Sequence, residues 1–226
     1  MINSLKEIRF FEKRIKFYDN IKSTSVYWIE KELNREYDLK NIKIEDNDLI
    51  IDIGAHVGVV STYISKINKN CKIYSYEPSL NSFNCLAHNL LMNDVKNVKI
   101  FNYAVTSDGR DVKMMMPFTN TGGSSLIFEP QNQNYFFNYV KSVNINQLIN
   151  EILIDEKTDK IKILKIDCEG SEYEILNSLS PEFFNKIEYL IGEFHTIQND
   201  ETKTPQKLLE HCQQYIDPNK IKVVFL

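Results

Sequence analysis

The stretch Leu-Ile-Ile-Asp-Ile-Gly-Ala-His-Val-Gly, residues 49–58, joins an apolar run to a turn that contains two glycines. Its first five residues are rich in β-branched side chains and predict a buried strand. Gly54 and Gly58 follow, so the chain can turn tightly there and a ligand can approach its backbone. The spacing is GxxxG, which differs from the GxGxxG of dinucleotide-binding folds. A purely structural turn is the alternative for this stretch taken alone.

Five further apolar runs repeat this pattern along the chain. The six predicted strands cover residues 49–53, 72–76, 98–103, 161–166, 187–194 and 221–226. Helices are expected between most of them, over about 58–67, 80–92, 171–179 and 204–215. Nearly continuous apolar strands that alternate with helices are typical of a parallel sheet covered on both faces. We therefore predict an α/β fold with a mostly parallel, doubly wound sheet, spanning residues 46–226.

Two segments lie outside this alternation. Residues 1–45 are expected to form a helical extension, because Ser4 and Glu7 have the spacing of a capping box and a second helical pattern covers about 25–37. Residues 105–147 show no clear helix until about Gln147, but they contain a turn of small residues and a cluster of aromatics. Connections of this length are usually functional or disordered, and the aromatics favour a loop over a site.

The second strand ends at Tyr76-Glu77-Pro78, which places an acid at the ligand edge of the sheet. Glu77 follows Asp52 by about 25 residues, a spacing at which an acid accepts hydrogen bonds from ribose hydroxyls. A lone glutamate at a strand end can also be simply a solvated side chain. Together with the glycine turn after Asp52, Glu77 predicts a cofactor that contains a nucleoside.

Acidic residues gather where the fourth and fifth strands end. The stretches concerned are Asp167-Cys-Glu169-Gly-Ser-Glu172 and Glu193-Phe-His195. Since the ends of parallel strands meet at one edge, these groups are expected to share a crevice. An acid and a histidine there supply a proton acceptor and its orienting partner, with a structural histidine as the alternative. Part of the cluster reflects the start of a helix, because Ser171 and Glu174 have capping-box spacing.

These motifs resemble the FkbM family of S-adenosylmethionine-dependent methyltransferases. The resemblance covers about residues 48–200 and rests on Asp52-x-Gly-Ala-x-x-Gly, Glu77-Pro78, Lys165-x-Asp167-x-Glu169-Gly170-x-Glu172 and Glu193-x-His195, with Asn93, Ala104 and Gly123-Ser124-Ser125 in agreement. It implies a Rossmann-like class I fold with seven strands, one of them antiparallel near the edge. Only six strands are predicted here, so either the last strand is lost or the chain is part of a longer, multidomain protein.

The resemblance also implies a role for each matching residue. The glycine turn would contact the amino-acid part of S-adenosyl-L-methionine, Glu77 would hold the ribose, and Ala104 would offer only backbone contacts near the adenine. His56 departs from the small residue found at this position in many class I enzymes, which argues against a cofactor contact by its side chain. The implied cofactor-binding residues are Asp52, Gly54, Ala55, Gly58, Glu77, Ala104 and Asp167.

We therefore predict an O-methyltransferase that acts on a hydroxyl of a sugar, glycan or related small molecule. The base is His195 or Asp167, and the predicted substrate-binding residues are Glu169, Glu193, Ser124 and Ser125. A degenerate methyltransferase fold that serves as a binding module is the alternative, and intact Asp52, Glu77 and Asp167 disfavour it. A nicotinamide oxidoreductase is disfavoured by the missing third glycine.

The acid cluster also raises the question of a metal. Mg²⁺ prefers oxygen ligands and would lower the pKa of a bound hydroxyl, so it is possible here. We favour a site without a metal ion, because Lys165 and the start of the helix after Gly170 already supply positive potential.

Composition argues against several other functions. The 226 residues carry a net charge of −4, whereas a protein that binds nucleic acid through phosphate contacts needs a basic surface. No apolar run approaches the roughly 20 residues needed to span a bilayer, and the first residues lack the apolar core of a signal peptide. The four cysteines are scattered without a CxxC pair, which is typical of reduced thiols in the cytoplasm.

Overall fold

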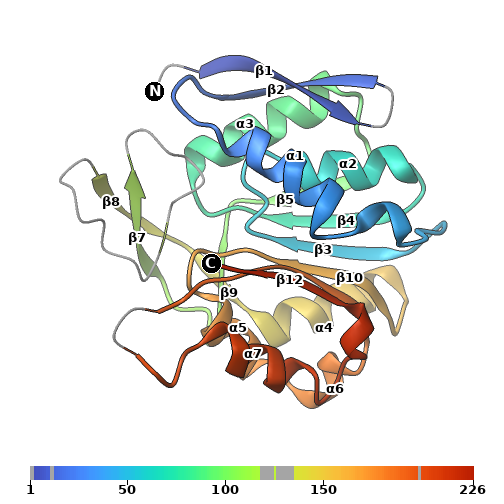
Figure 1. Ribbon diagram of the computed structural model, residues 1–226, viewed down its shortest axis with the longest axis vertical. Helices are drawn as coiled ribbons and strands as arrows, with labels where there is room; N and C mark the ends of the chain where they lie inside the picture. Colours follow the sequence, from blue (N-terminus) through green and yellow to red (C-terminus); the bar gives the residue numbers. More distant parts are fainter. Residues whose placement is uncertain (1–2, 11–12, 118–124, 126–134, 198–199) are drawn as a thin grey trace.

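Six parallel strands form the central sheet of the protein, seen here in a computed structural model. The structure describes residues 3–10, 13–117, 125, 135–197 and 200–226. The strands of the sheet are β3 (Leu49–Ile53), β4 (Lys72–Tyr76), β5 (Val98–Phe101), β10 (Ile161–Ile166), β11 (Ile187–Phe194) and β12 (Ile221–Phe225). Their order is β12-β11-β10-β3-β4-β5 (Figure 1). All six predicted strands are present, and the predicted doubly wound α/β fold is confirmed.

The order of the strands reverses between β3 and β10, which lie side by side. From β3 the chain proceeds outward through β4 to β5, and from β10 it proceeds the other way through β11 to β12. Such a reversal opens a crevice at the carboxyl ends of the two central strands. All neighbouring pairs in this sheet are parallel, so the antiparallel strand that the resemblance implied is absent from it within the described residues.

Helices cover both faces of the sheet (Figure 1). They are α1 (Ser25–Arg35), α2 (Val59–Ile67) and α3 (Leu80–Met92) on one face, and α4 (Ile145–Glu156), α5 (Glu172–Ser178), α6 (Pro181–Phe184) and α7 (Pro205–Cys212) on the other. Two short 3₁₀ turns, Leu39–Asn41 and Pro218–Lys220, precede β3 and β12. No helix in the described part of the chain is long and apolar enough to cross a membrane.

Alternation along β3 divides the interior into two cores. Ile50 points into the core beneath α1 and α2, whereas Leu49, Ile51 and Ile53 point into the core beneath α4, α5 and α7. All five residues of β3 are buried, Asp52 included. A strand that is buried on both faces needs an almost unbroken apolar sequence, which is why this run stands out in the sequence.

Residues 3–10 and 13–20 form two strands of a β-hairpin, so the prediction of helix at the start of the chain is wrong there. Strands β1 (Asn3–Phe10) and β2 (Lys13–Asn20) pair antiparallel. The sequence alternates with a period of two: Ile8 and Phe10 are buried, whereas Leu5 is 47% exposed. Leu5 and Ile8 are also compatible with a helical period, and packing of the hairpin against the sheet-covering helices decides the outcome. The second predicted helix is confirmed as α1.

The connection between β5 and α4 contains further strands, where the sequence suggested a loop. Strand β6 (Ala104–Thr106) pairs with β9 (Ser142–Asn144), and β7 (Val112–Pro117) pairs antiparallel with β8 (Tyr135–Val140). Met114 on β7 lines the crevice at the ligand edge. Most of the small-residue turn of this connection lies outside the described residues.

Docking of the hairpin supplies a test of the fold. Phe17 is fully buried, and its neighbour Phe10 stacks edge-on against Tyr63 of α2 at 4.8 Å between ring centroids. We expect Phe17→Ala to lower the free energy of unfolding in urea by about 3–5 kcal/mol through loss of a core aromatic. Lys16→Ala, at an exposed position of the same strand, should change it by less than about 0.5 kcal/mol. Equal effects of the two substitutions would show that the hairpin does not belong to the core.

Candidate active site

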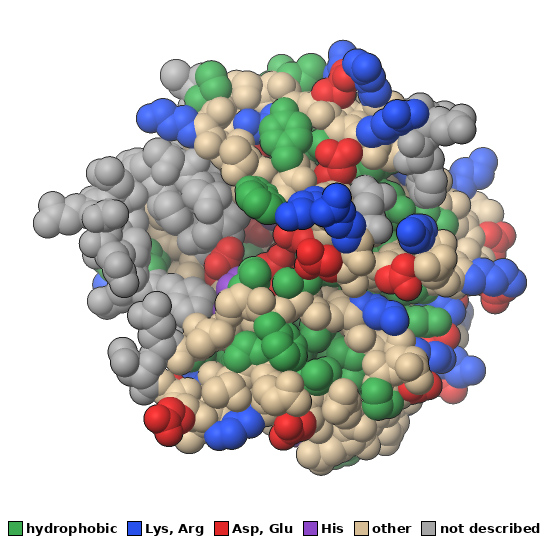
Figure 2. All heavy atoms as spheres, in the orientation of Figure 1, with side chains coloured by type: hydrophobic (Ala, Val, Ile, Leu, Met, Phe, Trp, Pro, Cys, Tyr) green, Lys and Arg blue, Asp and Glu red, His purple; other side chains and the backbone are tan. Residues whose placement is uncertain are grey.

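A cavity of about 360 Å³ opens at the carboxyl ends of β3, β4, β10 and β11. Figure 2 shows acidic side chains gathered in the middle of this face of the molecule. The described lining includes five acids and neither lysine nor arginine. Its polar and charged side chains are Thr24, Ser25, Glu32, His56, Glu77, Asp167, Glu169, Ser171 and Glu193.

The turn after β3 forms one wall of the cavity. Gly54 has φ +77°, and a Cβ added there would lie 1.8 Å from the backbone oxygen of Asp167, so no other residue fits. The backbone N–H groups of Gly54 and Ala55 both donate to the Tyr76 carbonyl at 3.0 Å. Gly58 has φ +85° and packs against Leu86, away from the described lining. Of the glycine turn, Gly54 and His56 therefore face the cavity, while Ala55 and Gly58 shape its backbone.

Asp52 lies beneath this turn and is fully buried. Its Oδ2 accepts a hydrogen bond from Ser61 at 2.5 Å, and its Oδ1 lies 3.5 Å from the ammonium nitrogen of Lys165. Lys165 donates in turn to the Gly54 carbonyl at 2.6 Å. Asp52 therefore acts on the turn from below, and among the described residues it is not part of the cavity wall.

Glu77 faces the cavity from the end of β4. Its Oε2 accepts the His56 N–H and its Oε1 accepts the Ser79 N–H, both at 2.8 Å. These bonds tie the second strand end to the glycine turn. Burial raises the pKa of Glu77 to about 7, against the lowering effect of the two N–H donors. Each carboxylate oxygen retains a further acceptor site, so the group fits the predicted contact with ribose hydroxyls.

Ala104 borders the cavity at its other end, near Tyr103 and Pro78. Its side chain is buried, and its N–H donates to the Lys141 carbonyl at 2.8 Å. This position therefore offers an apolar methyl group beside the cavity and no acid, which agrees with the predicted lack of a side-chain hydrogen bond to adenine.

The acids predicted at the ends of β10 and β11 do converge. Asp167, Glu169 and Glu193 all line the cavity. Burial, followed by the charge of Asp167, raises the pKa of Glu169 to about 7. Burial and the charges of Asp167 and Glu32 raise the pKa of Glu193 to about 9. Crowded carboxylates of this kind hold protons at neutral pH unless a cation enters the site.

His195 lies behind this acidic wall and is absent from the described lining. Its Nε2 lies 3.5 Å from Oε2 of both Glu169 and Glu193, and its Nδ1 lies 3.2 Å from Oε1 of the fully buried Glu172. Burial opposes the charged ring, but the hydrogen bond and charge of Glu172, with further acids, raise the pKa of His195 to about 9. At neutral pH the imidazole is therefore protonated and supports the carboxylates.

The predicted capping box of Ser171 and Glu174 does not form. The hydroxyl of Ser171 makes no cap hydrogen bond, and Glu174 instead pairs with Arg110 at 2.6 Å. The N–H groups of the turn are instead satisfied by Glu172, which accepts from Cys168 at 2.7 Å and Gly170 at 2.9 Å. The carboxylate that holds His195 thus also fixes the turn that carries Glu169.

Neither of the two serines predicted to bind the substrate is found in the described cavity lining. Ser124 lies outside the described residues. Ser125 is buried, and its hydroxyl donates to the backbone carbonyl of Glu169 at 2.6 Å. In this arrangement Ser125 supports the turn after β10.

Helix α1 supplies a residue that the sequence reasoning missed. Glu32 lines the cavity together with Trp28, one turn earlier on the same helix face. Burial, followed by the charge of Asp167, raises the pKa of Glu32. The spacing of Trp28 and Glu32 was the available signal, but nothing in the sequence indicated that this helix would cross the strand ends.

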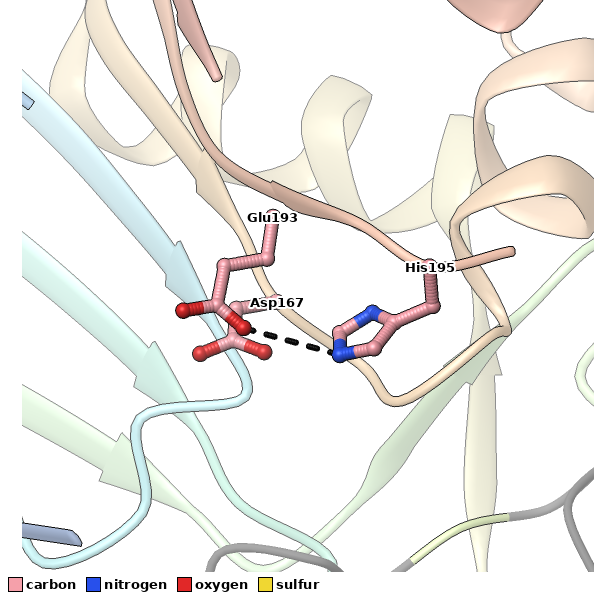
Figure 3. A group of neighbouring side chains, drawn as sticks. All are labelled: Asp167, Glu193 and His195. Carbon is pink, nitrogen blue, oxygen red and sulfur yellow. Dashed lines mark ion pairs between the residues drawn. The ribbon is translucent and has the colours of Figure 1, made fainter. Parts of the chain in front are cut away.

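Asp167, Glu193 and His195 also have the arrangement of a possible metal site (Figure 3). Each offers one ligand atom, and these atoms lie within 4.8 Å of one another. The carboxyl groups of Asp167 and Glu193 point toward each other, with the His195 ring facing them. Lys165 provides a permanent cation 3.6 Å from Asp167.

The chain belongs to the FkbM methyltransferase family, because the profile described as "Methyltransferase FkbM domain" matches residues 52–216. It is 27% identical over 206 residues to "Methyltransferase sdnD" of Sordaria araneosa, covering 80% of this chain and 78% of that protein. It is 20% identical over 209 residues to "Hexuronic acid methyltransferase AglP" of Haloferax volcanii, covering 89% and 79%. A solved structure, a putative rRNA-methylase from Clostridium thermocellum, aligns with TM-score 0.47 and 8% identity, covering 83% and 82%.

The predicted family, fold class and cofactor are confirmed: the protein is a methyltransferase of class I fold that uses S-adenosyl-L-methionine. Gly54 and Glu77 fit that cofactor, since one leaves room at the backbone and the other retains acceptor sites. The donor supplies an electrophilic methyl group, and the protein's task is to align an acceptor with it and remove a proton.

Cofactor binding depends on Glu77 if this carboxylate holds the ribose. We expect Glu77→Ala to weaken S-adenosylmethionine binding by roughly 1.5–3 kcal/mol, the contribution of hydrogen bonds to a charged group. Titration calorimetry measures the affinity, and circular dichroism verifies that the variant is folded. Glu151→Ala, at an exposed position of α4, is the control. An unchanged affinity in folded Glu77→Ala would contradict the ribose assignment.

Removal of metal ions tests the group formed by Asp167, Glu193 and His195. Because Lys165 and protonated His195 already lie beside these carboxylates, we expect methyl transfer to persist after dialysis against EDTA. Turnover is measured before dialysis, after it, and after addition of Mg²⁺ or Mn²⁺. Activity that disappears and returns with the ion would establish a metal site here.

Proposed function

We propose that the protein is an O-methyltransferase whose acceptor is a hydroxyl of a sugar, glycan or related small molecule. The observation that carries this proposal is the continuity of one cavity, which joins the cofactor-binding turn at Gly54 and Glu77 to carboxylates at Asp167, Glu169 and Glu193. Carboxylates and exposed aromatics suit a molecule with several hydroxyls. The similarity to AglP, whose name describes a hexuronic acid methyltransferase, supports a sugar acceptor.

In this reaction the acceptor oxygen attacks the methyl carbon of the sulfonium. A C–O bond forms as the C–S bond breaks, the electron pair of that bond stays on sulfur, and the hydroxyl proton passes to a base. Asp167 is the better candidate for the base, because it lines the cavity and His195 does not. His195, protonated below a pKa of about 9, positions Glu169 and Glu193 for the hydroxyls of the acceptor.

Other partners and functions fit this cavity less well. Its described lining has five acids and no lysine or arginine, which disfavours the phosphates of a nucleic acid. A binding module without activity would not require Glu77 at the cavity wall together with the buried Asp52–Lys165 pair beneath the turn. We also propose the cytoplasm as the compartment, since all four cysteines are free thiols.

Substitution of the two candidate bases separates their roles. We expect Asp167→Asn to lower turnover by about 10²–10⁴-fold, the usual contribution of a general base, and to change cofactor affinity much less. His195→Gln should retain more activity, because its effect passes through Glu169 and Glu193. The measurement is turnover against pH. A loss in His195→Gln equal to that in Asp167→Asn, with a wild-type rate that rises to about pH 9, would identify His195 as the base.

A further inference from the structure

Helix α1 and strand β11 bring two carboxyl groups together across the acceptor end of the cavity. Glu32, Asp167 and Glu193 all line this cavity, and the charges of Asp167 and Glu32 both act on the carboxyl group of Glu193. These three acids come from α1, from the turn after β10 and from β11. Their convergence is a tertiary feature of the cavity and has no counterpart in any one sequence motif.

Two basic groups lie beside these acids, and each is shared with further partners. Lys165 donates to the Gly54 carbonyl and is shared between Asp52 and Asp167. His195 is shared among Glu169, Glu172 and Glu193. Among the described residues Glu32 forms no ion pair, and its Oε2 is buried without a hydrogen-bond partner. The cavity therefore contains carboxyl groups in excess of the cations beside them.

Aromatic side chains line the same cavity as these carboxyl groups. Trp28 is 57% exposed, lines the same cavity and precedes Glu32 by one turn of α1. The ammonium group of Lys31 lies over its ring at 4.8 Å from the centroid, which shows that the ring attracts a cation. Tyr103, 40% exposed, also lines it. Carboxylates beside the face of an aromatic ring are the surroundings that bind ammonium groups best, through charge-assisted hydrogen bonds and cation–π attraction.

We infer that the acceptor carries a protonated amine, as an amino sugar does, and that Glu32 and Glu193 bind this amine while Asp167 faces the hydroxyl to be methylated. The inference rests on the proposed O-methyltransferase function and names the chemical class of its acceptor. An ammonium group has three donors, enough for the unpartnered oxygen of Glu32 and for Glu193.

The same arrangement decides which group reacts. A protonated amine has no lone pair and cannot attack the methyl carbon, so carboxylates that keep it protonated direct transfer to oxygen. An acceptor with a carboxylate, such as a hexuronic acid, would place a further negative charge beside Glu32, Asp167 and Glu193. The cavity of this chain should therefore select against the kind of acceptor for which AglP is named.

The test compares D-glucose with two sugars that each differ from it at one group. D-glucosamine carries an amine in place of one hydroxyl, and D-glucuronate carries a carboxylate in place of the CH₂OH group. Binding to the full chain, saturated with S-adenosylhomocysteine, is measured by calorimetry at neutral pH. We expect glucosamine to bind roughly 10- to 100-fold more tightly than glucose, the factor of a charge-assisted hydrogen bond, and glucuronate to bind more weakly than glucose. Equal affinities, preference for glucuronate, or no binding of glucosamine at millimolar concentration would overturn the inference.

Glu32→Gln keeps the shape of the side chain and removes its charge. We expect this variant to lose most of the preference for glucosamine and to retain the affinity for S-adenosylmethionine. Glu36→Gln, one turn later and exposed, should keep both. Weaker cofactor binding in Glu32→Gln would assign the acid pair to the cofactor and overturn the inference. If the variant does not fold, the comparison of sugars on the unaltered chain still decides.

Methyl transfer itself is followed separately by mass spectrometry of the product. Glucosamine that binds with the expected preference but is never methylated on oxygen would count against the proposed function and leave the amine-binding site standing. Transfer to an oxygen of glucose, without any preference for glucosamine, would support the proposed function and overturn the amine-binding site.

Discussion

The buried ammonium group of Lys165 connects the parts of the ligand edge. It lies 3.5 Å from Asp52 on β3 and 3.6 Å from Asp167 after β10, and it donates to the backbone of the turn that carries Gly54. Burial opposes its charge, yet Asp167 and Asp52 hold the pKa of Lys165 above its ordinary value. Loss of one partner from a buried pair typically costs 3–5 kcal/mol, so the turn, the two strand ends and this cation form one unit.

Charge is arranged in two layers around that unit. Lys165 and His195 lie behind the cavity wall, and Glu169, Glu193 and Asp167 stand in front of them. Lys165 and His195 orient the three acids, but these two cations are fewer than the acids around them. Negative potential at the point of reaction favours binding of the positively charged sulfonium donor. It also stabilises the positive charge that develops on a neutral hydroxyl oxygen as this oxygen attacks, before the proton passes to the base.

Sequence periodicity identified the central sheet because strands buried on both faces, such as Leu49–Ile53, leave a plain apolar signal. It also placed Glu77, Asp167 and Glu193 at one edge, since parallel topology alone brings strand ends together. It failed at Leu5 and Ile8, whose spacing of three residues fits one face of a helix, whereas tertiary packing selects a strand that buries Ile8 and exposes Leu5. It also missed Glu32, because the path of a helix across the sheet depends on long-range contacts that no local pattern contains.

The position of α1 in the chain has a consequence for how this enzyme can diversify. The family profile begins at residue 52, whereas α1, with Trp28 and Glu32, lies before that point. Gly54 and Glu77, which fit the donor, lie within the matched region, whereas part of the wall of the proposed acceptor site comes from a segment before it. Substitutions on one face of α1 can alter which molecules are accepted while the cofactor turn stays intact, so acceptor choice and donor chemistry are free to evolve separately.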